Sequence, residues 1–217
     1  ILLEEREFNL KKLLDDIVNV VEKQSKECQL EIIQCDYQIK HWNLIGSPIH
    51  IKRMLMNILS NAVKYNRYKG KIILDCREVS CIGNAALIEF ICKDTGIGMS
   101  KEYQEHIFEP FTQEFNSARS SFGGTGLGMP ITKSLVEAMG GNIEFESEKN
   151  VGTTFRLKIP FKIDDCVHIE EPTEEEHNVS IEGVRVLVAE DNDLNMEITE
   201  FVLSSVGAVV IKASNGQ

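Results

Sequence analysis

The sequence predicts an α/β protein, because segments with helical periodicity alternate with segments that have the pattern of strands. Apolar residues recur at intervals of three and four in residues 11–27 and again in the segment that follows Pro48. Apolar and polar residues alternate in residues 142–148 and 153–161, as in half-buried antiparallel strands. A continuous apolar run at residues 184–189 is typical of a buried parallel strand.

The first part of the chain is expected to contain two helices and two short strands. Residues 11–27 carry apolar side chains on one helical face and charged side chains on the other. Strand-like runs follow at residues 30–35 and 39–45. A serine and Pro48 then have the pattern of an N-cap and a first helical residue, which predicts a helix to about residue 65.

The next elements are expected to be paired strands and a third long helix. Residues 71–78 and 85–93 have the composition of two neighbouring strands. The segment that follows is rich in Gly, Ser, Thr, Asn and Phe, apart from a short helix around residues 102–108. Residues 131–139 form an amphipathic pattern that ends at two consecutive glycines, which predicts a helix and its termination.

Composition and charge exclude several classes of protein. The 217 residues are 42% hydrophobic and 26% charged, as in ordinary globular domains. A formal net charge of −11 argues against a surface for nucleic acid or anionic lipid. No apolar run approaches the ~20 residues that span a bilayer. The six cysteines form no CxxC pair and the five histidines have no zinc-like spacing, so we expect reduced thiols and structural histidines in a cytoplasmic protein.

An acidic segment divides the chain. Residues 164–178 contain seven acidic residues and no Lys or Arg, which is typical of a solvated linker. A strand at residues 184–189, a helix at 194–206 and a strand at 208–211 are expected to follow, as the beginning of a parallel α/β unit. We therefore expect domains at residues 8–163 and 184–217, joined by a linker at 164–183.

Asn57, Asn61 and Lys64 form a polar row on the helix after Pro48. At 100° per residue they lie together, away from the apolar face of the same helix. Such a row is compatible with a solvated helix face. It is also compatible with a magnesium–phosphate site, because amide oxygens are hard, neutral ligands for Mg²⁺ and an ammonium group attracts phosphate.

Asp94 follows the strand at residues 85–93 and precedes Gly96 and Gly98. An acidic residue followed by glycine is often only a turn. A carboxylate at the end of a strand can instead accept a hydrogen bond from the exocyclic amine of adenine, whereas the carbonyl at the same position of guanine would be repelled. The two glycines would let the backbone pass close to a flat base.

A glycine-rich segment, residues 123–128, precedes the third long helix. Glycine-rich turns at helix N-termini bind phosphate through free N–H groups and the helix dipole. The Rossmann fingerprint is not matched, because the preceding residues are polar and do not form a buried strand. The P-loop is not matched either, because no lysine follows the glycines.

Five segments together resemble, in order and spacing, the boxes of sensor histidine kinases. They are residues 57–65, 94–99, 107–111, 124–129 and 152–155. The catalytic domain of these kinases has the Bergerat ATPase fold, shared with gyrase, heat-shock chaperones and mismatch-repair proteins. The resemblance covers about residues 8–161. It implies a two-layer α/β sandwich with a mixed sheet on one side and helices on the other, and ATP with Mg²⁺ beneath a lid at residues 112–123.

The resemblance also implies a role for each matching residue. Asn61 would hold Mg²⁺ with the support of Asn57, while Lys64 and Arg119 would contact phosphates. Asp94 would bind the adenine amine, joined through water by Thr153. The remaining residues would shape the base pocket or wrap the phosphates: Tyr65, Gly96, Gly98, Gly124, Thr125, Gly126, Leu127 and Gly128. Phe108 and Phe111 would pack beside the lid, or serve as ordinary core aromatics.

Position 57 separates the branches of this superfamily. In the members that hydrolyse ATP, a glutamate at this position activates water. Asn57 has no useful basicity, so water attack is poorly served and the γ-phosphoryl group can be kept for a protein acceptor. The resemblance therefore implies transfer to a histidine, which in this family lies upstream on a helical hairpin.

Residues 184–195 resemble the start of a response-regulator receiver. Glu190 and Asp191 would belong to its Mg²⁺-binding acidic cluster. A kinase followed by a receiver implies a hybrid histidine kinase that acts in a phosphorelay. The parent protein is expected to be bacterial and homodimeric. Whether it is anchored in the inner membrane is left open. We expect the given sequence to be a fragment, with residues 1–7 as the end of the upstream hairpin and both phosphoacceptor residues outside it.

Two other functions are left open. One is a Bergerat-fold serine kinase of the anti-sigma-factor type, which the receiver-like residues disfavour. The other is a catalytically silent module that senses ATP, which the complete set of boxes disfavours. The acid lability of a phosphorylated product would separate the histidine kinase from the serine kinase.

Overall fold

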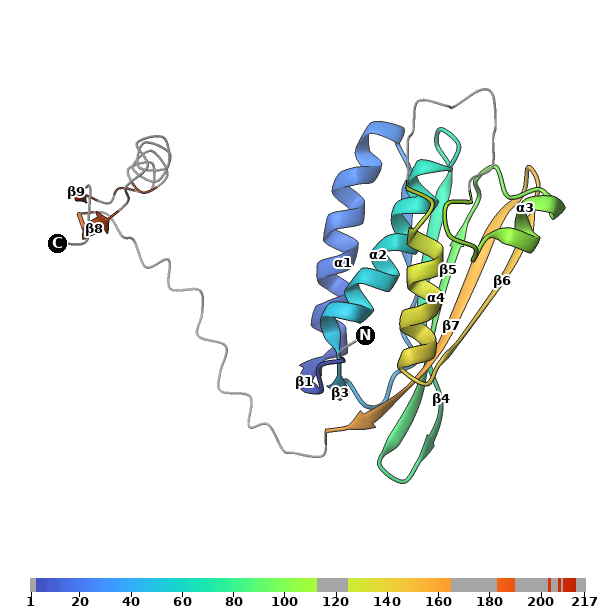
Figure 1. Ribbon diagram of the computed structural model, residues 1–217, viewed down its shortest axis with the longest axis horizontal. Helices are drawn as coiled ribbons and strands as arrows, with labels where there is room; N and C mark the ends of the chain where they lie inside the picture. The colour runs from blue at the N-terminus through green and yellow to red at the C-terminus, as the bar shows by residue number, and fades with distance from the viewer. Residues whose placement is uncertain are drawn as a thin grey trace. The chain divides into compact units, whose positions relative to one another are not determined.

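A computed structural model describes residues 3–112, 125–164, 183–189 and 209–213, together with Leu203 and Gly207 (Figure 1). The chain divides into two compact units, Ile1–Cys166 and Val167–Gln217. Four predicted site residues lie outside the described residues, as does the predicted lid except for Thr112. These residues are Arg119, Gly124, Glu190 and Asp191.

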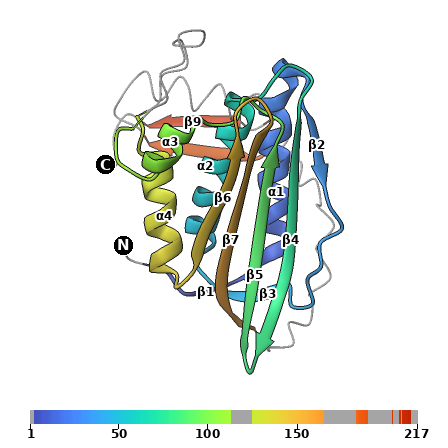
Figure 2. The same ribbon diagram turned by 90° about the vertical axis from the view of Figure 1, so that its right-hand side faces the viewer.

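The first unit has two layers, a sheet and a layer of helices that covers one of its faces (Figures 1 and 2). The helices of this layer are α1 (Leu10–Ser25), α2 (Pro48–Lys64) and α4 (Gly128–Ala138). The strands are β1 (Arg6–Asn9), β2 (Glu31–Gln34), β3 (Asn43–Gly46), β4 (Lys71–Ile82), β5 (Ala85–Asp94), β6 (Asn142–Glu148) and β7 (Gly152–Ile163). A 3₁₀ turn, η1 (Lys26–Cys28), and a short helix, α3 (Lys101–His106), complete the unit as described.

The sheet is mixed. Its order is β1-β3-β7-β5-β4-β2, and β6 also pairs with β7. The pair β2–β4 is parallel, whereas the other pairs are antiparallel. The two-layer sandwich with a mixed sheet that the resemblance implied is therefore confirmed.

Local sequence explains where the long helices begin and end. The side chain of Asn9 caps α1 by accepting a hydrogen bond of 3.1 Å from the backbone N–H of Lys12. Pro48 occupies the start of α2, as predicted. The expected N-cap Ser47 makes no side-chain cap and instead lies with its hydroxyl 2.6 Å from Nδ1 of His50. After α4, Gly140 adopts a φ of 72°, a left-handed conformation that suits glycine.

The core lies between the sheet and the helices. On the sheet side, alternate residues of β5 and β7 such as Phe90 and Leu157 are fully buried. On the helix side, Leu14 and Ile58 are buried to within 1% of complete burial. In a strand every second residue faces the same side, and in a helix the same side returns every 3.6 residues. The apolar residues of the sequence repeat at these intervals, which is why they predicted the elements.

The structure corrects three local predictions. Residues 1–7 were expected to be the end of a helix, but residues 3–5 are not helical, and Arg6 and Glu7 belong to β1, which pairs with β3 from Arg6–Gly46 to Asn9–Asn43. Strand β3 begins at Asn43 and not at residue 39. Strand β4 continues to Ile82, beyond the predicted end at residue 78. In each case the pairing partner decides the length of the strand: β1 and β3 pair with each other, and the last residues of β4 pair with the start of β5 across a tight hairpin.

The second unit is described only in part. Strands β8 (Arg185–Ala189) and β9 (Val209–Ala213) pair in parallel, from Arg185–Val209 to Ala189–Ala213. The predicted parallel arrangement is therefore confirmed. The predicted helix at 194–206 lies outside the described residues except for Leu203, which is helical.

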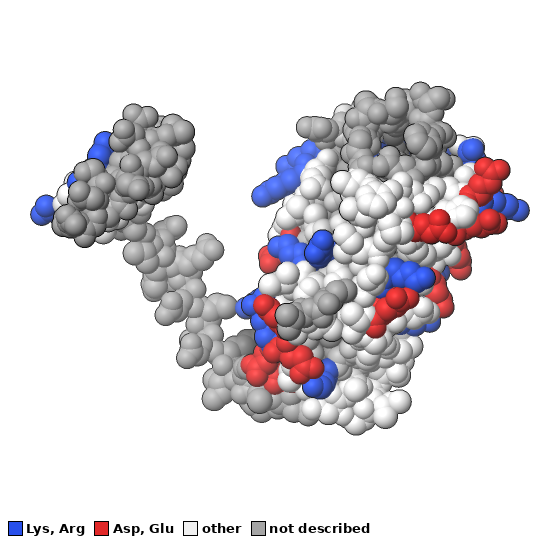
Figure 3. All heavy atoms as spheres, viewed as in Figure 1, with Lys and Arg blue, Asp and Glu red and all other residues white. Residues whose placement is uncertain are grey.

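The charge of the described surface and the hydropathy of the described helices can be compared with the expectations from the sequence. On the face drawn in Figure 3, basic and acidic side chains are interspersed, so the net negative charge is not concentrated in one patch of that face. Among the described helices, none combines the length and the apolar character needed to cross a membrane.

Candidate functional site

Helix α2 and the start of helix α4 meet at Asn57. The side-chain amide of Asn57 donates hydrogen bonds of 3.3 Å to the carbonyl oxygen of Gly128 and 3.2 Å to the hydroxyl of Thr132. The hydroxyl of Thr132 in turn donates a hydrogen bond of 2.9 Å to the same carbonyl oxygen. The polar row of α2 and the end of the glycine-rich segment, which are distant in sequence, therefore lie together.

Asn61 and Lys64 continue this row along α2, and both side chains are partly exposed. The side-chain amide of Asn61 makes no hydrogen bond with any residue that the structure describes. The Lys64 ammonium lies 4.8 Å from the centre of the Tyr65 ring, a cation–π contact. Of these two residues of the row, Lys64 contacts another described side chain, whereas no such hydrogen bond is formed by the Asn61 amide.

Asp94 stands at the last position of β5, with one carboxylate oxygen bound and one open. Its Oδ1 accepts hydrogen bonds from the backbone N–H groups of Gly96, at 2.8 Å, and Thr153, at 3.3 Å. Its Oδ2 accepts none from the described part of the chain. Burial raises the pKa of the Asp94 carboxyl above its ordinary value, and the two backbone hydrogen bonds lower it in part. The side chain is thus fixed in orientation and keeps an acceptor for a ligand.

Thr153 lies opposite Asp94, because β5 and β7 pair these two residues. Its hydroxyl lies 2.9 Å from the hydroxyl of Ser147 on β6. Ser147 also accepts a hydrogen bond of 2.9 Å from the backbone N–H of Met99. Ser147 was not predicted, because a serine in an alternating strand has the same pattern as any exposed polar residue.

Two glycines bring the loop after β5 into close backbone contact with its neighbours. A Cβ atom on Gly96 would lie 2.8 Å from Oδ1 of Asp94, and one on Gly98 would overlap the carbonyl oxygen of Glu148. Gly98 also has a φ of 61°. The backbone N–H of Ile97 donates a hydrogen bond of 3.0 Å to the carbonyl oxygen of Tyr65. The loop therefore joins the C-terminal end of α2 to the end of β5.

The glycine-rich segment is described from Thr125 onward. Gly126 has a φ of 67°, and a Cβ atom there would lie 2.8 Å from the backbone of Phe111. The Thr125 hydroxyl accepts a hydrogen bond of 3.4 Å from the N–H of Leu127, the residue that precedes α4. The first turn of α4 contains no acidic residue, so its positive dipole end is not neutralised locally.

The two aromatic residues of the third box differ in environment. Phe108 packs edge-to-face on Phe145 with ring centres 5.8 Å apart, and the Lys133 ammonium lies 5.1 Å from its ring centre. Phe111 is 75% exposed, and its backbone N–H donates a hydrogen bond of 3.1 Å to Gly126. Phe108 is thus an ordinary packing residue, whereas Phe111 is available for contacts outside the core.

The described residues fit an adenine nucleotide with its metal. They supply an open carboxylate oxygen at the end of β5, a loop whose glycines permit close approach, and a helix N-terminus beside a row of amides. The backbone hydrogen bond from Ile97 to Tyr65 holds the C-terminal end of α2 beside the loop that follows Asp94. Among the described residues, the side-chain amide of Asn57 donates to the Gly128 carbonyl oxygen and the Thr132 hydroxyl and to no carboxylate.

Comparison with known proteins agrees with this geometry. The family model of the histidine kinase-, DNA gyrase B-, and HSP90-like ATPases matches residues 46–163. The chain belongs to this ATPase family. The matched residues include α2, Asp94, Thr153 and the glycines Gly96, Gly98, Gly126 and Gly128.

Relatives of this ATPase-family chain are named as sensor kinases. The Sensor protein GacS of Pseudomonas syringae pv. syringae is 33% identical over 210 residues, which is 96% of this chain and 22% of that protein. The Signal transduction histidine-protein kinase BarA of Escherichia coli K12 is 30% identical over 211 residues, 97% of this chain and 22% of that protein. The chain therefore spans about a fifth of the length of these relatives.

Solved structures share the fold of this ATPase-family chain. Full-length ShkA in complex with AMPPNP superposes with a TM-score of 0.63 at 23% identity, over 100% of this chain and 42% of that one. The catalytic domain of the histidine kinase ThkA superposes with a TM-score of 0.57 at 24% identity, over 72% of this chain and 95% of that one. Both likenesses show that this chain shares the two-layer α/β fold of these structures.

Proposed function

We propose that the first unit is the ATP-binding catalytic domain of a hybrid sensor histidine kinase, which transfers the γ-phosphoryl group of ATP to a histidine on a helical hairpin. The observation that carries this proposal is the open carboxylate oxygen of Asp94, held beside glycines at one end of the sheet. Membership of the ATPase family and the names of the relatives support it.

The adenine would lie against the end of β5. The open Oδ2 of Asp94 would accept a hydrogen bond from the exocyclic amine, while Gly96 and Thr153 hold Oδ1 in place. The Thr153 hydroxyl would take part through water. Guanine presents a carbonyl at the same position, so Asp94 would select ATP over GTP. Tyr65 would pack near the base or the sugar, and Gly98 would keep the loop close to the base.

The phosphates and Mg²⁺ would lie between α2 and the start of α4. Asn61 would supply an amide oxygen to the metal, and Asn57 would support it from the same helix. Lys64 and Arg119 would contact phosphate oxygens, as would the backbone N–H groups of the glycine-rich segment, whose members are Gly124, Thr125, Gly126, Leu127 and Gly128. When bound, Mg²⁺ supplies charge neutralisation and orientation of the phosphates.

The chain's own residues would act by positioning, and not as a covalent or acid–base catalyst. The amide nitrogen of Asn57 is engaged with Gly128 and Thr132, and an amide cannot take a proton from water. Hydrolysis would therefore be slow, and the phosphoryl group would be kept for the acceptor histidine. We place that histidine on the hairpin and not among the five histidines of this chain.

The partners follow from the same proposal. The catalytic domain would meet the hairpin of a homodimeric parent protein and act in the cytoplasm, and the phosphoryl group would pass to a receiver domain or a response regulator. Residues 184–217 would begin such a receiver, with Glu190 and Asp191 in its Mg²⁺ site. The parallel pairing of β8 and β9 supports this assignment of the second unit.

Transfer of radiolabelled phosphate from ATP tests the proposal. With the parent's hairpin supplied as a separate polypeptide, we expect a hairpin-bound product that is acid-labile and alkali-stable, as phosphoramidates are. Asn61→Ala should abolish transfer, whereas Asn142→Ala, an exposed position on β6, should leave it unchanged. An acid-stable product would indicate a serine kinase, and ATP binding without any transfer would indicate a sensing module.

A further inference from the structure

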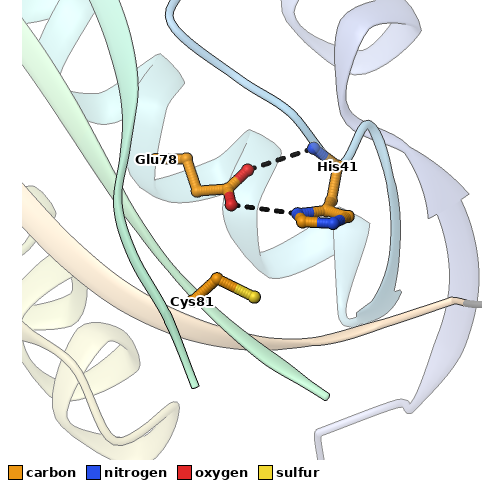
Figure 4. Close-up of side chains that lie close together, drawn as sticks. All are labelled: His41, Glu78 and Cys81. Atoms are coloured by element: carbon orange, nitrogen blue, oxygen red, sulfur yellow. Dashed lines mark hydrogen bonds and ion pairs between the residues drawn. The ribbon is translucent and has the colours of Figure 1, made fainter. Parts of the chain in front are cut away.

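A second group of polar side chains converges far from the nucleotide site. It consists of His41, in the loop before β3, and Glu78 and Cys81 on β4 (Figure 4). Potential ligand atoms of the three residues all lie within 4.8 Å of one another, and in the described part of the chain no other His, Cys, Asp and Glu set meets this description. The group is near the β4–β5 hairpin. The β5 partners of Glu78 and Cys81 are Ile88 and Ala86, and Asp94 at the opposite end of β5 is about 20–27 Å from them along the strand.

A β-bulge puts Glu78 and Cys81 on the same face of the sheet. In a regular strand, residues three apart point to opposite faces. Here the register with β5 shifts between Glu78 and Ser80, so Glu78 pairs with Ile88 and Cys81 pairs with Ala86. Because Ile88 and Ala86 are two residues apart on β5, their partners share a face. Bulges re-aim side chains in this way at functional positions.

Glu78 is held in a single orientation by the loop that contains His41. Its Oε2 accepts hydrogen bonds from the backbone N–H groups of Lys40, at 2.9 Å, and His41, at 3.0 Å. Its Oε1 lies 2.9 Å from Nδ1 of His41. The Glu78 side chain is 4% exposed and the His41 side chain is 36% exposed. The carboxylate is thus oriented and largely desolvated, while the imidazole and the exposed Cys81 border solvent.

From this geometry we propose that His41, Glu78 and Cys81 form a binding site for Zn²⁺. One imidazole nitrogen, one carboxylate oxygen and one thiolate sulfur are ligands that Zn²⁺ accepts in proteins, whereas Mg²⁺ and Ca²⁺ take oxygen ligands. Three protein ligands leave a fourth tetrahedral position for water on the solvent side, next to Cys81.

The distances need only a small adjustment. Ligands about 2.0 Å from a tetrahedral zinc ion are about 3.3 Å apart, close to the 2.9 Å between Nδ1 of His41 and Oε1 of Glu78. A sulfur at about 2.3 Å from the ion is about 3.6 Å from the other ligands, so Cys81 would move by about 1 Å. Its thiol now donates a long hydrogen bond of 3.8 Å to the carbonyl oxygen of Gly83.

Binding of Zn²⁺ requires two protons to leave the ligand atoms. On binding, Cys81 releases its thiol proton to solvent, and the proton that His41 shares with Glu78 moves from Nδ1 to Nε2. Oε2 of Glu78 keeps its two backbone hydrogen bonds, so the loop and β4 become joined by the metal as well as by these bonds. The site would stabilise this end of the unit independently of ATP.

Titration of the full chain with Co²⁺, without nucleotide and with a phosphine reductant, tests the site. A thiolate-to-cobalt charge-transfer band should appear in the near ultraviolet and disappear when Zn²⁺ is added. Cys81→Ser should abolish the band and weaken Zn²⁺ binding by more than about 100-fold, because losing an outer-shell partner already costs about 10- to 100-fold. Cys28→Ser, which also changes an exposed cysteine, should behave as the wild type.

Thermal unfolding gives an independent readout. Excess Zn²⁺ should raise the Tm of the wild type and of Cys28→Ser, but not that of Cys81→Ser or His41→Ala. Melting without metal shows whether each variant folds. The proposal is overturned if saturating Co²⁺ gives no band in the wild type, if Cys81→Ser keeps the band, or if Cys28→Ser loses it.

Discussion

Asn57 and Thr132 are 75 positions apart in the sequence, and the side-chain amide of Asn57 donates a hydrogen bond of 3.2 Å to the Thr132 hydroxyl. Thr132 is fully buried, and its hydroxyl donates a hydrogen bond to the carbonyl oxygen of Gly128. The pair therefore fixes the polar row of α2 against the first turn of α4. It also commits the amide nitrogen of Asn57 to two acceptors within the protein.

Thr132→Val should destabilise the first unit by about 1–3 kcal/mol. The substitution keeps the shape of the side chain and removes the hydroxyl, so the amide of Asn57 loses a partner in a partly buried setting. Urea unfolding measures the change. Thr154→Val, a partly exposed position on β7, is the matched control and should change the free energy of unfolding by less than about 0.5 kcal/mol. Equal effects of the two substitutions would contradict the role assigned to the Asn57–Thr132 pair.

Asp94→Ala should weaken ATP binding by roughly 10- to 150-fold. A hydrogen bond to a charged group contributes about 1.5–3 kcal/mol, and the variant loses the one from the adenine amine. Calorimetry with ATP measures the effect, and GTP, which should bind weakly to both proteins, serves as the control ligand. Unchanged affinity for ATP in Asp94→Ala would refute the assignment of the base pocket.

ATP affinity should fall as the pH is lowered through the raised pKa of Asp94. The protonated carboxyl cannot accept from the amine at the protonated oxygen, and burial makes protonation begin above the ordinary aspartate value of ~3.9. The stability of the folded protein without ATP should change with pH in the opposite direction to the ATP affinity. A raised pKa contributes stability that is present at low pH and is lost as the pH rises through that pKa.

Asp94→Asn separates this titration from that of the phosphates. Protonation of ATP affects both proteins equally and therefore cancels in the ratio of wild-type to variant affinity. This ratio should begin to decrease with falling pH above the ordinary pKa of an aspartate. A ratio that stays constant down to a pH of ~4 would show that Asp94 has no raised pKa in the folded protein.

Gly98→Ala should be more damaging than Gly83→Ala, although both glycines have a φ near 60°. The left-handed backbone costs an alanine about 1–2 kcal/mol at either position. At Gly83 a Cβ atom meets nothing within 4 Å, whereas at Gly98 it overlaps the carbonyl oxygen of Glu148. The clash should add about 1–3 kcal/mol and displace the loop of the base pocket.

Unfolding and ATP calorimetry on the two glycine variants check this prediction. Gly83→Ala should keep wild-type ATP affinity, because Gly83 is in the β4–β5 hairpin, at the far end of β5 from Asp94. Gly98→Ala should lose most of it. Comparable stability and affinity in the two variants would show that the close approach at Gly98 does not shape the site.

Much of the fold was predictable because it depends on local patterns. The apolar faces of α1 and α2 repeat every three or four residues, so burial of one face is encoded within each segment. The same holds for the alternation in β6 and β7. The motif residues, including Asn61 and Asp94, were predicted because their spacing is a property of the chain and needs no coordinates.

Tertiary structure decided the features that depend on partners distant in sequence. Residues 6–9 form β1 because β3 pairs with them, and a pattern of only four residues does not predict such a pairing. Ser147 entered the site through the register of β6 with β7. The bulge in β4 brought Glu78 and Cys81 to His41, although their spacing matches no metal motif.

The sequence by itself therefore determined the type and order of the long elements, the set of motif residues and the family. Tertiary structure decided the partners of Asn57, the raised pKa of Asp94 and the convergence of His41, Glu78 and Cys81. The reason is physical. Periodicity and turn chemistry act between neighbours along the chain, whereas desolvation, strand register and hydrogen bonding at a site depend on residues that only folding brings together.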